Sequence, residues 1–315
     1  MHIRKKKIVL GIDIGGTKIK VGLVRADGTL VAEPLQIATG TTDPSEKILH
    51  RLFLLIEEML SKCPSAELLG IGLGCTGPLD IENGMILECN NLPTLQNYPL
   101  RKAIEEQFAL NVTMNNDANA MILGEALWGA GKEAQTVLGI TLGTGLGCAF
   151  VQHKRLWNGA TASAGEIWTA PYRDGIIEEY VSGNAISRLY YERTGEKVRA
   201  PKVADLARKG DVEALLCWEE FRKALVFVLA WVTNMMDPDV LIVGGSVVHS
   251  SDLFWEATES SFRQQICPAV ARHVQLVPAH FKDNAGFIGA AALLFANDSH
   301  KNKYILRIYL LLFYY

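Results

Sequence analysis

The sequence predicts an α/β protein with two lobes, each of which opens with a strand, a glycine turn and a second strand. The first observation is length, because 315 residues exceed the roughly 100 to 200 at which one core usually stops growing. The second is an internal repeat, in which Val9-Leu10-Gly11-Ile12 recurs 128 residues later as Val137-Leu138-Gly139-Ile140. This period is far longer than the roughly 20 to 50 residues of a solenoid unit, and so indicates a duplicated lobe.

Both copies of the repeat continue in the same way. The first runs into Gly15-Gly16-Thr17 and the second into Gly143-Thr144-Gly145. A short apolar strand follows each set of glycines, at 18–24 and at 146–151. We therefore expect two β-hairpins that present equivalent glycine turns, one in each lobe.

The remaining elements follow from apolar periodicity and from turn and cap residues. After the first hairpin, Asp27-Gly28 predicts a turn into a third antiparallel strand at 29–34. Helical patterns that alternate with strands make the fold class α/β. The other expected elements are a helix that starts at Thr42-Asp43-Pro44 and reaches Met59, a strand at 69–73, a helix at 211–236 that stops at Asp237-Pro238-Asp239, a strand at 240–243 and a helix at 285–295.

From these elements we expect a small lobe of residues 1–118 together with about 285–298, and a large lobe of residues 119–284. A tail of unknown role would follow at 299–315. Its apolar part, 304–315, is shorter than the roughly 20 residues of a membrane span. It could dock on the body as a strand or helix, anchor the protein to a surface, or have no functional meaning.

Composition excludes several classes of protein. The net charge of −3 provides no basic field for nucleic acid, although residues 4–7 form a short basic run. The apolar stretch after Lys7 ends at Asp13 without a cleavage site, so we expect no secretory signal, no membrane partner and a cytoplasmic protein. Six cysteines without a CxxC pair favour reduced thiols over disulfides or a zinc site.

The glycine turns are candidate phosphate sites, because backbone N–H groups without a Cβ beside them can approach phosphate oxygens closely. Gly15-Gly16-Thr17-Lys18 alone could be a structural hairpin, but the second copy favours phosphate binding from two sides. Neither loop has the spacing of a P-loop or of a dinucleotide fingerprint. Asp13 could hold Mg²⁺ through water or simply cap the turn, and Lys18 could face phosphate or solvent.

Several carboxylates and amides could bind a polyol. Asn116 and Asp117 precede a helical pattern, so Asp117 could be a plain N-cap. The pair could instead bind adjacent hydroxyl groups, with Asp117 accepting a proton from one of them. Glu166 and Glu178 lie in a stretch without regular pattern, where carboxylates can accept hydrogen bonds from hydroxyls, although surface glutamates are common.

Taken together, these segments resemble the ROK family of sugar kinases and repressors, within the actin-like hexokinase superfamily. The resemblance covers about Ile8 to Leu294 and implies a two-lobed actin-like, ribonuclease H-like ATPase fold. It is carried by GIDIGGTKIKVGLV (11–24), GLGCTGPLD (72–80), the NLP and PL stretch (91–100), NNDANA (115–120), GEALWGAG (124–131), GITLGTGLGCAFV (139–151), GATASAGEI (159–167), EEYVSGNAI (178–186), LIVGGSV (241–247) and AGFIGAAALL (285–294).

The resemblance implies a role for each matching position. Asp117 would be the catalytic base, and Asp13 would hold Mg²⁺ through water. The implied ATP-binding residues are Asp13, Gly15, Gly16, Thr17, Lys18, Gly143, Thr144 and Gly145, with Gly244 and Gly245 at adenosine. The implied sugar-binding residues are Gly77, Pro78, Asn116, Asp117, Glu166 and Glu178.

The resemblance also implies an activity, namely ATP-dependent phosphorylation of a hexose at its 6-hydroxyl, with ATP, Mg²⁺ and sugar in the cleft between the lobes. Glucose is the default substrate, and an N-acetylated amino sugar or a β-glucoside is the alternative. Dimers are common in the family, so a homodimer is possible. A non-catalytic sugar sensor is the alternative from another class, but the family's repressors carry a DNA-binding motif ahead of the first phosphate loop, where only about seven residues precede Ile8.

One segment departs from the family pattern. ROK proteins usually have a histidine and a zinc-binding cysteine cluster between the two glutamates, whereas this chain has Thr169 at the histidine position and Ile176 at the last cysteine position. Because the sulfur ligands are missing, we expect no structural zinc. The Trp168-Thr169 pair should also reshape the sugar pocket near the anomeric carbon.

Overall fold

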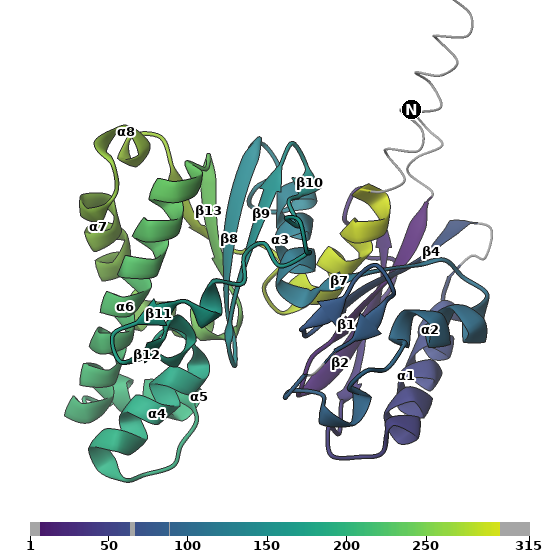
Figure 1. The fold of residues 1–315 in the computed structure, drawn as a ribbon, viewed down its shortest axis with the longest axis horizontal. Coiled ribbons are helices and arrows are strands. Elements are labelled where there is room, and N and C mark those ends of the chain that lie inside the picture. Colours follow the sequence, from purple (N-terminus) through teal and green to yellow (C-terminus); the bar gives the residue numbers. More distant parts are fainter. Residues whose placement is uncertain (1–6, 64–66, 88, 297–315) are drawn as a thin grey trace, which may run out of the picture. The chain divides into compact units, whose positions relative to one another are not determined.

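The computed structural model describes residues 7–63, 67–87 and 89–296, and the chain divides into two compact units. The described residues up to Gly129 and from Asn284 onward form the first unit, and Ala130–Asp283 form the second. Figure 1 shows the elements of each. The tail at 299–315, for which the sequence left several interpretations open, lies outside the described residues.

The boundary between the units differs from the expected one after residue 118. Helix α3 (Asp117–Trp128) belongs to the first unit. It packs so closely on the 285–296 helix that a Cβ at Gly124 would lie 2.7 Å from the Gly289 Cα. The expected boundary after residue 118 cuts through the first turn of this helix, because the sequence gives no sign of its packing partner.

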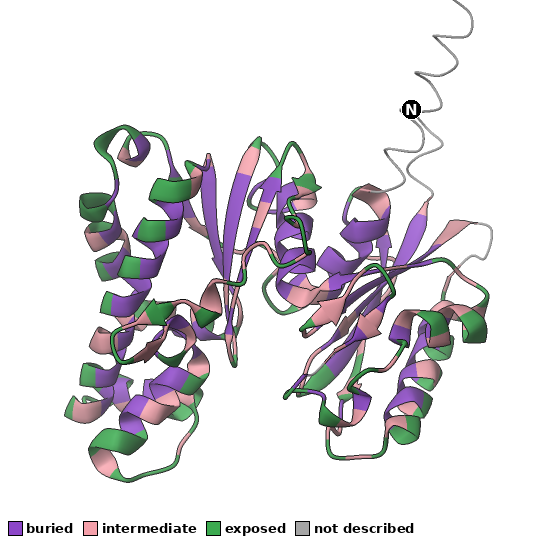
Figure 2. Cartoon of the chain, viewed as in Figure 1, coloured by how far each residue is buried: buried purple, intermediate pink, exposed green. Residues whose placement is uncertain are grey.

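The first unit is built on a five-stranded sheet with the order β3-β2-β1-β4-β7. Strands β1, β2 and β3 are antiparallel, whereas β4 and β7 run parallel to β1. The apolar faces are covered by helices, including α1 and α2, and Figure 2 shows the strands as largely buried. The bounds are β1 (Ile8–Ile14), β2 (Lys18–Arg25), β3 (Leu35–Ala38), β4 (Leu68–Cys75), β7 (Val112–Asn116), α1 (Ser45–Leu60) and α2 (Leu100–Phe108).

The third strand begins later than the sequence predicted. The turn at Asp27-Gly28 forms as expected, but of the residues at 29–34 only Leu30 makes an isolated bridge, to Val24. Strand β3 pairs instead with residues 18–21 of β2. Pro34 has no N–H to give to a ladder, so regular pairing starts only after it.

The second unit repeats the topology of the first. Its sheet has the order β10-β9-β8-β13-β14, with an antiparallel hairpin beside parallel strands. This equivalence confirms the duplication that the 128-residue repeat indicated. The bounds are β8 (Thr136–Leu142), β9 (Leu146–Gln152), β10 (Arg155–Leu156), β13 (Val240–Gly244) and β14 (Gln275–Pro278).

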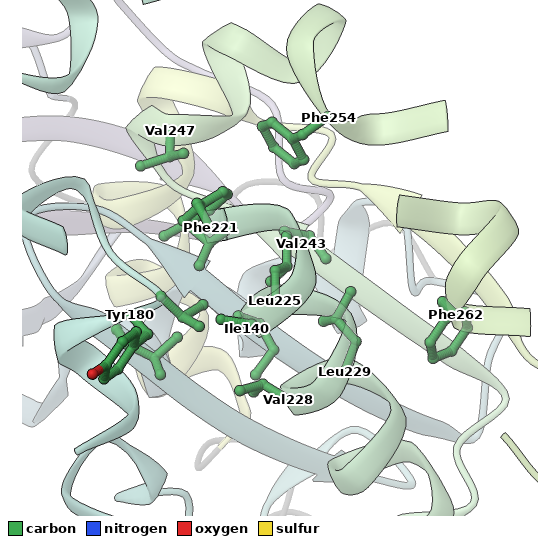
Figure 3. Close-up of a cluster of buried hydrophobic side chains, with 14 of the residues drawn as sticks. Ile140, Tyr180, Phe221, Leu225, Val228, Leu229, Val243, Val247, Phe254 and Phe262 are labelled. Carbon is green, nitrogen blue, oxygen red and sulfur yellow. The ribbon is translucent and has the colours of Figure 1, made fainter. Parts of the chain in front are cut away.

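The core of the second unit lies between this sheet and helix α6 (Val212–Met236). Figure 3 shows Phe221, Leu225 and Leu229 of α6 directed at Ile140 and Val243 of the sheet. The other helices are α4 (Gly183–Thr194), α5 (Ala200–Arg208), α7 (Trp255–Gln265) and α8 (Pro268–Ala271). None of the helices in the described ranges has the length and apolarity needed to cross a membrane.

Both ends of α6 follow the sequence prediction. The Asp211 side chain accepts a hydrogen bond from the Ala214 N–H at 2.8 Å and caps the helix. Asp237 ends it in a left-handed conformation, with φ of 44°. Pro238 then prevents continuation, so β13 starts where the sequence placed it.

The 285–296 helix completes the first unit through unusually close contact with the sheet. A Cβ at Gly11 of β1 would lie 1.9 Å from the Phe287 carbonyl oxygen. One at Gly72 of β4 would lie 1.9 Å from the Ala290 carbonyl oxygen. Backbone atoms cannot move aside as side-chain ends can, so glycine is required at both positions.

Substitution of Gly72 tests this close contact. We expect Gly72→Ala to lower the free energy of unfolding by about 3 kcal/mol, because the added methyl must displace backbone of the helix. The matched control is Gly74→Ala on the same strand, where a Cβ would meet the Ala120 Cβ at an ordinary 3.4 Å. It should cost less than about 1 kcal/mol. Urea denaturation followed by circular dichroism measures both, and equal losses would contradict the packing explanation.

Candidate functional site

Polar residues of the first unit meet at the carboxyl edge of its parallel strands. Register brings the ends of β1, β4 and β7 together, since Ile14 pairs with Cys75 and Cys75 with Asn116. Ligands of α/β sheets usually bind outside the carboxyl ends of the strands. The predicted residues Asp13, Asn116 and Asp117 all lie at or next to this edge.

Asp13 is a partly buried carboxylate of β1. Burial, and secondly the nearby charge of Asp117, raise the pKa of Asp13 from 3.8 to about 7, against the opposing influence of Lys18 and Lys20. The start of the 285–296 helix lies against it, because a Cβ at Gly286 would be 2.1 Å from the Asp13 Oδ2. Asp13 therefore has a carboxyl group that changes its charge near neutral pH.

Asn116 and Asp117 both lie at the start of α3. The cap of α3 is Asn116, whose Oδ1 accepts the Ala118 N–H at 2.9 Å. Asp117 Oδ1 also accepts from that N–H, at 2.7 Å. Gly77, which is joined to Pro78 by a cis peptide bond, lies beside them, since a Cβ there would be 3.2 Å from the Asn116 Nδ2. The structure thus brings the four residues of the first unit that were predicted to bind sugar into one neighbourhood.

The first glycine loop is a turn closed by a backbone hydrogen bond. The Gly15 N–H donates to the Lys18 carbonyl at 3.1 Å. Thr39 holds the loop from the side, with its hydroxyl donating to the Gly15 carbonyl at 2.7 Å. Within the described residues, the N–H groups of Gly16 and Thr17 have no hydrogen-bond partner. Such amides suit an anion.

The second glycine loop has an equivalent arrangement. The Gly143 N–H donates to the Gly145 carbonyl at 3.0 Å, and the Leu146 N–H donates to Glu178 Oε2 at 2.8 Å. The N–H groups of Thr144 and Gly145 have no partner in the part of the chain that the structure describes. Each loop therefore has two N–H groups without a partner among the described residues.

The predicted adenosine residues lie next to this second loop. Gly244 ends β13 and pairs with Thr141 of β8. Gly245 has φ of 89°, and a Cβ there would lie 2.4 Å from the Leu142 carbonyl oxygen. Because Leu142 directly precedes Gly143, the two glycine turns are neighbours in the second unit.

Glu166 is positioned by contacts on several sides. Gly165 before it has φ of 91°, and a Cβ there would lie 2.1 Å from the Cys148 carbonyl oxygen. The Trp168 indole N–H donates to Glu166 Oε2, and the Thr169 hydroxyl donates to the Glu166 carbonyl at 3.3 Å. Trp168 therefore holds the Glu166 carboxylate, and Thr169 holds the Glu166 backbone.

Glu166 and Glu178 stand at two adjacent short helical turns. Glu166 precedes the 3₁₀ turn η4 (Ile167–Thr169), and Glu178 lies within η5 (Ile177–Glu179). The Ile177 N–H donates to the Ala170 carbonyl at 2.9 Å and joins the turns. A two-stranded hairpin of β11 (Pro171–Tyr172) and β12 (Gly175–Ile176) occupies the segment between them.

Sequence reasoning missed several residues that shape these groups. Lys20 is buried, donates to the Asn284 Oδ1 at 2.7 Å and pairs with Asp13 across the hairpin. Its position could have been found from hairpin register alone. No local signal marked Gly286, because its requirement comes from the contact with Asp13.

The residues present fit a magnesium ion that is bound together with phosphates. No group of three or more His, Cys, Asp or Glu side chains in the described ranges could hold a metal ion. Asp13 supplies one carboxylate next to a loop with free amides. Mg²⁺ usually takes one or two carboxylates and completes its shell with water and phosphate oxygens, so a single carboxylate at this position is sufficient.

Comparison with known proteins identifies the family. The sequence profile of the ROK family matches residues 9–297. The chain belongs to the ROK family. Its relatives include a glucokinase from Thermotoga maritima, 28% identical over 91% of this chain and 96% of that protein, and an N-acetyl-D-glucosamine kinase from Vibrio cholerae, 30% identical over 90% and 98%. They also include a putative xylose repressor from a Caldicellulosiruptor species, 27% identical over 92% of this chain and 78% of the repressor.

A solved structure agrees with the fold. The ROK family glucokinase from Streptomyces griseus, in complex with glucose and AMPPNP, is 28% identical and covers 91% of this chain and 98% of its own, with a TM-score of 0.78. This likeness confirms the predicted α/β fold with two sheets of the actin-like kind.

The proximity of Asp13 and Asp117 can be tested by titration. We expect Asp117→Asn to lower the pKa of Asp13 below about 7, since it removes a negative charge that favours the protonated form. Lys20→Met should raise that pKa, because it removes a positive charge. Carboxyl ¹³C NMR against pH measures both, with the signal assigned by Asp13→Asn. Asp80→Asn, at the end of the short strand β5 (Leu79–Asp80) of the same unit, is the control and should leave the Asp13 signal unchanged.

Proposed function

We propose that this protein is a kinase that transfers the γ-phosphoryl group of ATP to the 6-hydroxyl of a hexose or hexose derivative. The observation that carries the proposal is the carboxyl edge of the first sheet. There a proton acceptor, Asp117, lies near the partly buried carboxylate of Asp13 and the first glycine loop. The kinases among the relatives support the same assignment.

In this reaction the residues of the chain position groups and accept one proton. The sugar hydroxyl oxygen forms a bond to the γ-phosphorus while the bond from that phosphorus to the bridging oxygen of ADP breaks. Asp117 accepts the hydroxyl proton. The unpaired amides of Gly16, Thr17, Thr144 and Gly145 would receive phosphate oxygens. Mg²⁺, when bound at Asp13, would neutralise phosphate charge.

The sugar would be held by the remaining predicted residues. Asn116 offers its Nδ2 amide, since its Oδ1 caps α3. Glu166 offers Oε1, since Oε2 is engaged by Trp168. With one oxygen in use, Glu166 would recognise one hydroxyl more readily than a vicinal pair. A sugar in which one hydroxyl of the pair is substituted would then bind as well as glucose. A β-glucoside and an N-acetylated amino sugar therefore belong to the proposed substrates.

The proposal is tested by ADP release. Purified protein with Mg-ATP should release ADP with at least one of glucose, N-acetylglucosamine, N-acetylmannosamine and methyl β-glucoside, at a kcat of about 1 to 100 per second. ³¹P NMR of the product locates the phosphate. ADP formation that does not exceed the sugar-free background for any sugar would refute the kinase. Sugar binding in calorimetry without ADP release would favour the non-catalytic sensor instead.

Asp117→Asn isolates the proton acceptor. The amide keeps the shape and the contact with the Ala118 N–H but cannot take a proton, so kcat should fall by about 10²- to 10⁴-fold. The calorimetric Kd values for sugar and for AMPPNP should change by less than about threefold. Asp80→Asn serves as the control and should keep full activity. A kcat for Asp117→Asn within a factor of three of the wild type would remove Asp117 as the base.

A further inference from the structure

Glu178 contacts the second glycine loop directly. Its Oε2 accepts the Leu146 N–H at 2.8 Å, at the point where the loop enters β9. A Cβ at Gly145 would lie 2.3 Å from the same oxygen. The carboxylate therefore lies against the loop backbone, in the space that a side chain at 145 would take.

The start of helix α4 holds the same loop from its carbonyl side. The Gly183 N–H donates to the Gly143 carbonyl at 2.8 Å, and the Asn184 N–H donates to the Thr144 carbonyl at 3.2 Å. A Cβ at Gly183 would lie 2.7 Å from the Gly143 carbonyl oxygen. Helix and loop are thus in close backbone contact.

Ser182 connects these two contacts. Its hydroxyl donates to the Glu178 backbone carbonyl at 2.8 Å and accepts the Ala185 N–H at 3.0 Å as the cap of α4. Ser182 itself is fully buried. Glu178, Ser182 and the first residues of α4 consequently form one clamp around the loop, which we call the 178–184 clamp.

The second oxygen of Glu178 is available to a ligand. Oε1 accepts no hydrogen bond from the residues that the structure describes, and Glu178 is only partly buried. A carboxylate can accept hydrogen bonds on both oxygens at once. A hydroxyl group can therefore bind Oε1 while Oε2 stays on the Leu146 N–H.

We propose that Glu178 couples sugar binding to nucleotide binding, because one carboxylate accepts a sugar hydroxyl with Oε1 and holds the second glycine loop with Oε2. This inference rests on the proposed function, which assigns the loop to phosphate, and on the sugar-binding role that the family resemblance implies for Glu178. A sugar that fixes the Glu178 side chain also fixes the loop amides of Thr144 and Gly145. The nucleotide then meets an ordered loop, and the two ligands favour each other by the same factor.

Calorimetry of AMPPNP binding tests the coupling. The Kd of AMPPNP with Mg²⁺ is measured without sugar and with saturating glucose, or with whichever sugar the ADP assay selects. We expect sugar to lower the wild-type Kd by about tenfold, within the usual range of coupling between sites. In Glu178→Ala the sugar should change the Kd by less than about twofold.

Three variants separate coupling from sugar affinity and from folding. Glu166→Gln should weaken sugar binding yet keep the tenfold effect once sugar is saturating, because Glu166 makes no hydrogen bond to the loop in the described residues. Glu179 is next to Glu178 in sequence, but its carboxylate accepts the Ile176 N–H at 3.0 Å. Glu179→Gln should therefore keep the tenfold effect of sugar as well. Glu178→Gln retains an acceptor for the Leu146 N–H and should have a wild-type Tm. The factor by which sugar lowers its AMPPNP Kd should be at least threefold smaller than in the wild type.

The outcomes distinguish this inference from the proposed function. The inference would be overturned if sugar lowered the AMPPNP Kd of Glu178→Ala as much as it lowers that of the wild type. If the alanine variant does not fold, the same result in Glu178→Gln would overturn it. An equal loss in Glu166→Gln would overturn it as well, and so would an active wild-type enzyme in which sugar leaves the AMPPNP Kd unchanged. A wild type that releases no ADP with any sugar would instead overturn the proposed function.

Discussion

The first unit depends on how closely a helix backbone can approach a sheet. The 285–296 helix touches β1 and β4 through Gly11 and Gly72, and it touches α3 through Gly289. These contacts leave no space for a Cβ, so the helix sits at backbone distance and its first turn reaches the end of β1. Asp13 is desolvated there, and its pKa rises to about 7. The same packing that closes the core thus sets the charge behaviour of a site residue.

Close backbone approach also shapes the second glycine loop, in the second unit. Glycine at 145 and at 183 admits a carboxylate and a helix start to the loop backbone. Glu178 accepts the Leu146 N–H, and the first residues of α4 donate to the carbonyls of Gly143 and Thr144. The N–H groups of Thr144 and Gly145 have no partner among the described residues. The end of the loop is therefore held by a segment more than 30 residues further along the chain.

Some features could be read from the sequence because they depend on neighbouring residues. The hairpins, the cap at Asp211 and the stop at Asp237-Pro238 are local, and all of them form as predicted. The third strand was placed too early, because the local sequence does not show which residues of β2 this strand will pair with. The boundary between the units was also misplaced, because α3 joins the first unit through contact with a helix far along the chain.

The sequence by itself determined the two-lobed α/β class, the repeat with its glycine turns, and the types of residue offered to phosphate and sugar. A repeat and the residue types of a turn can be recognised from the order of residues alone, so these features could be predicted without a structure. Only the tertiary structure decided that Asn116 is the cap of α3, that Trp168 engages Glu166, and that Glu178 holds a loop. Each of these depends on which atoms meet after folding, and spacing along a chain does not specify that.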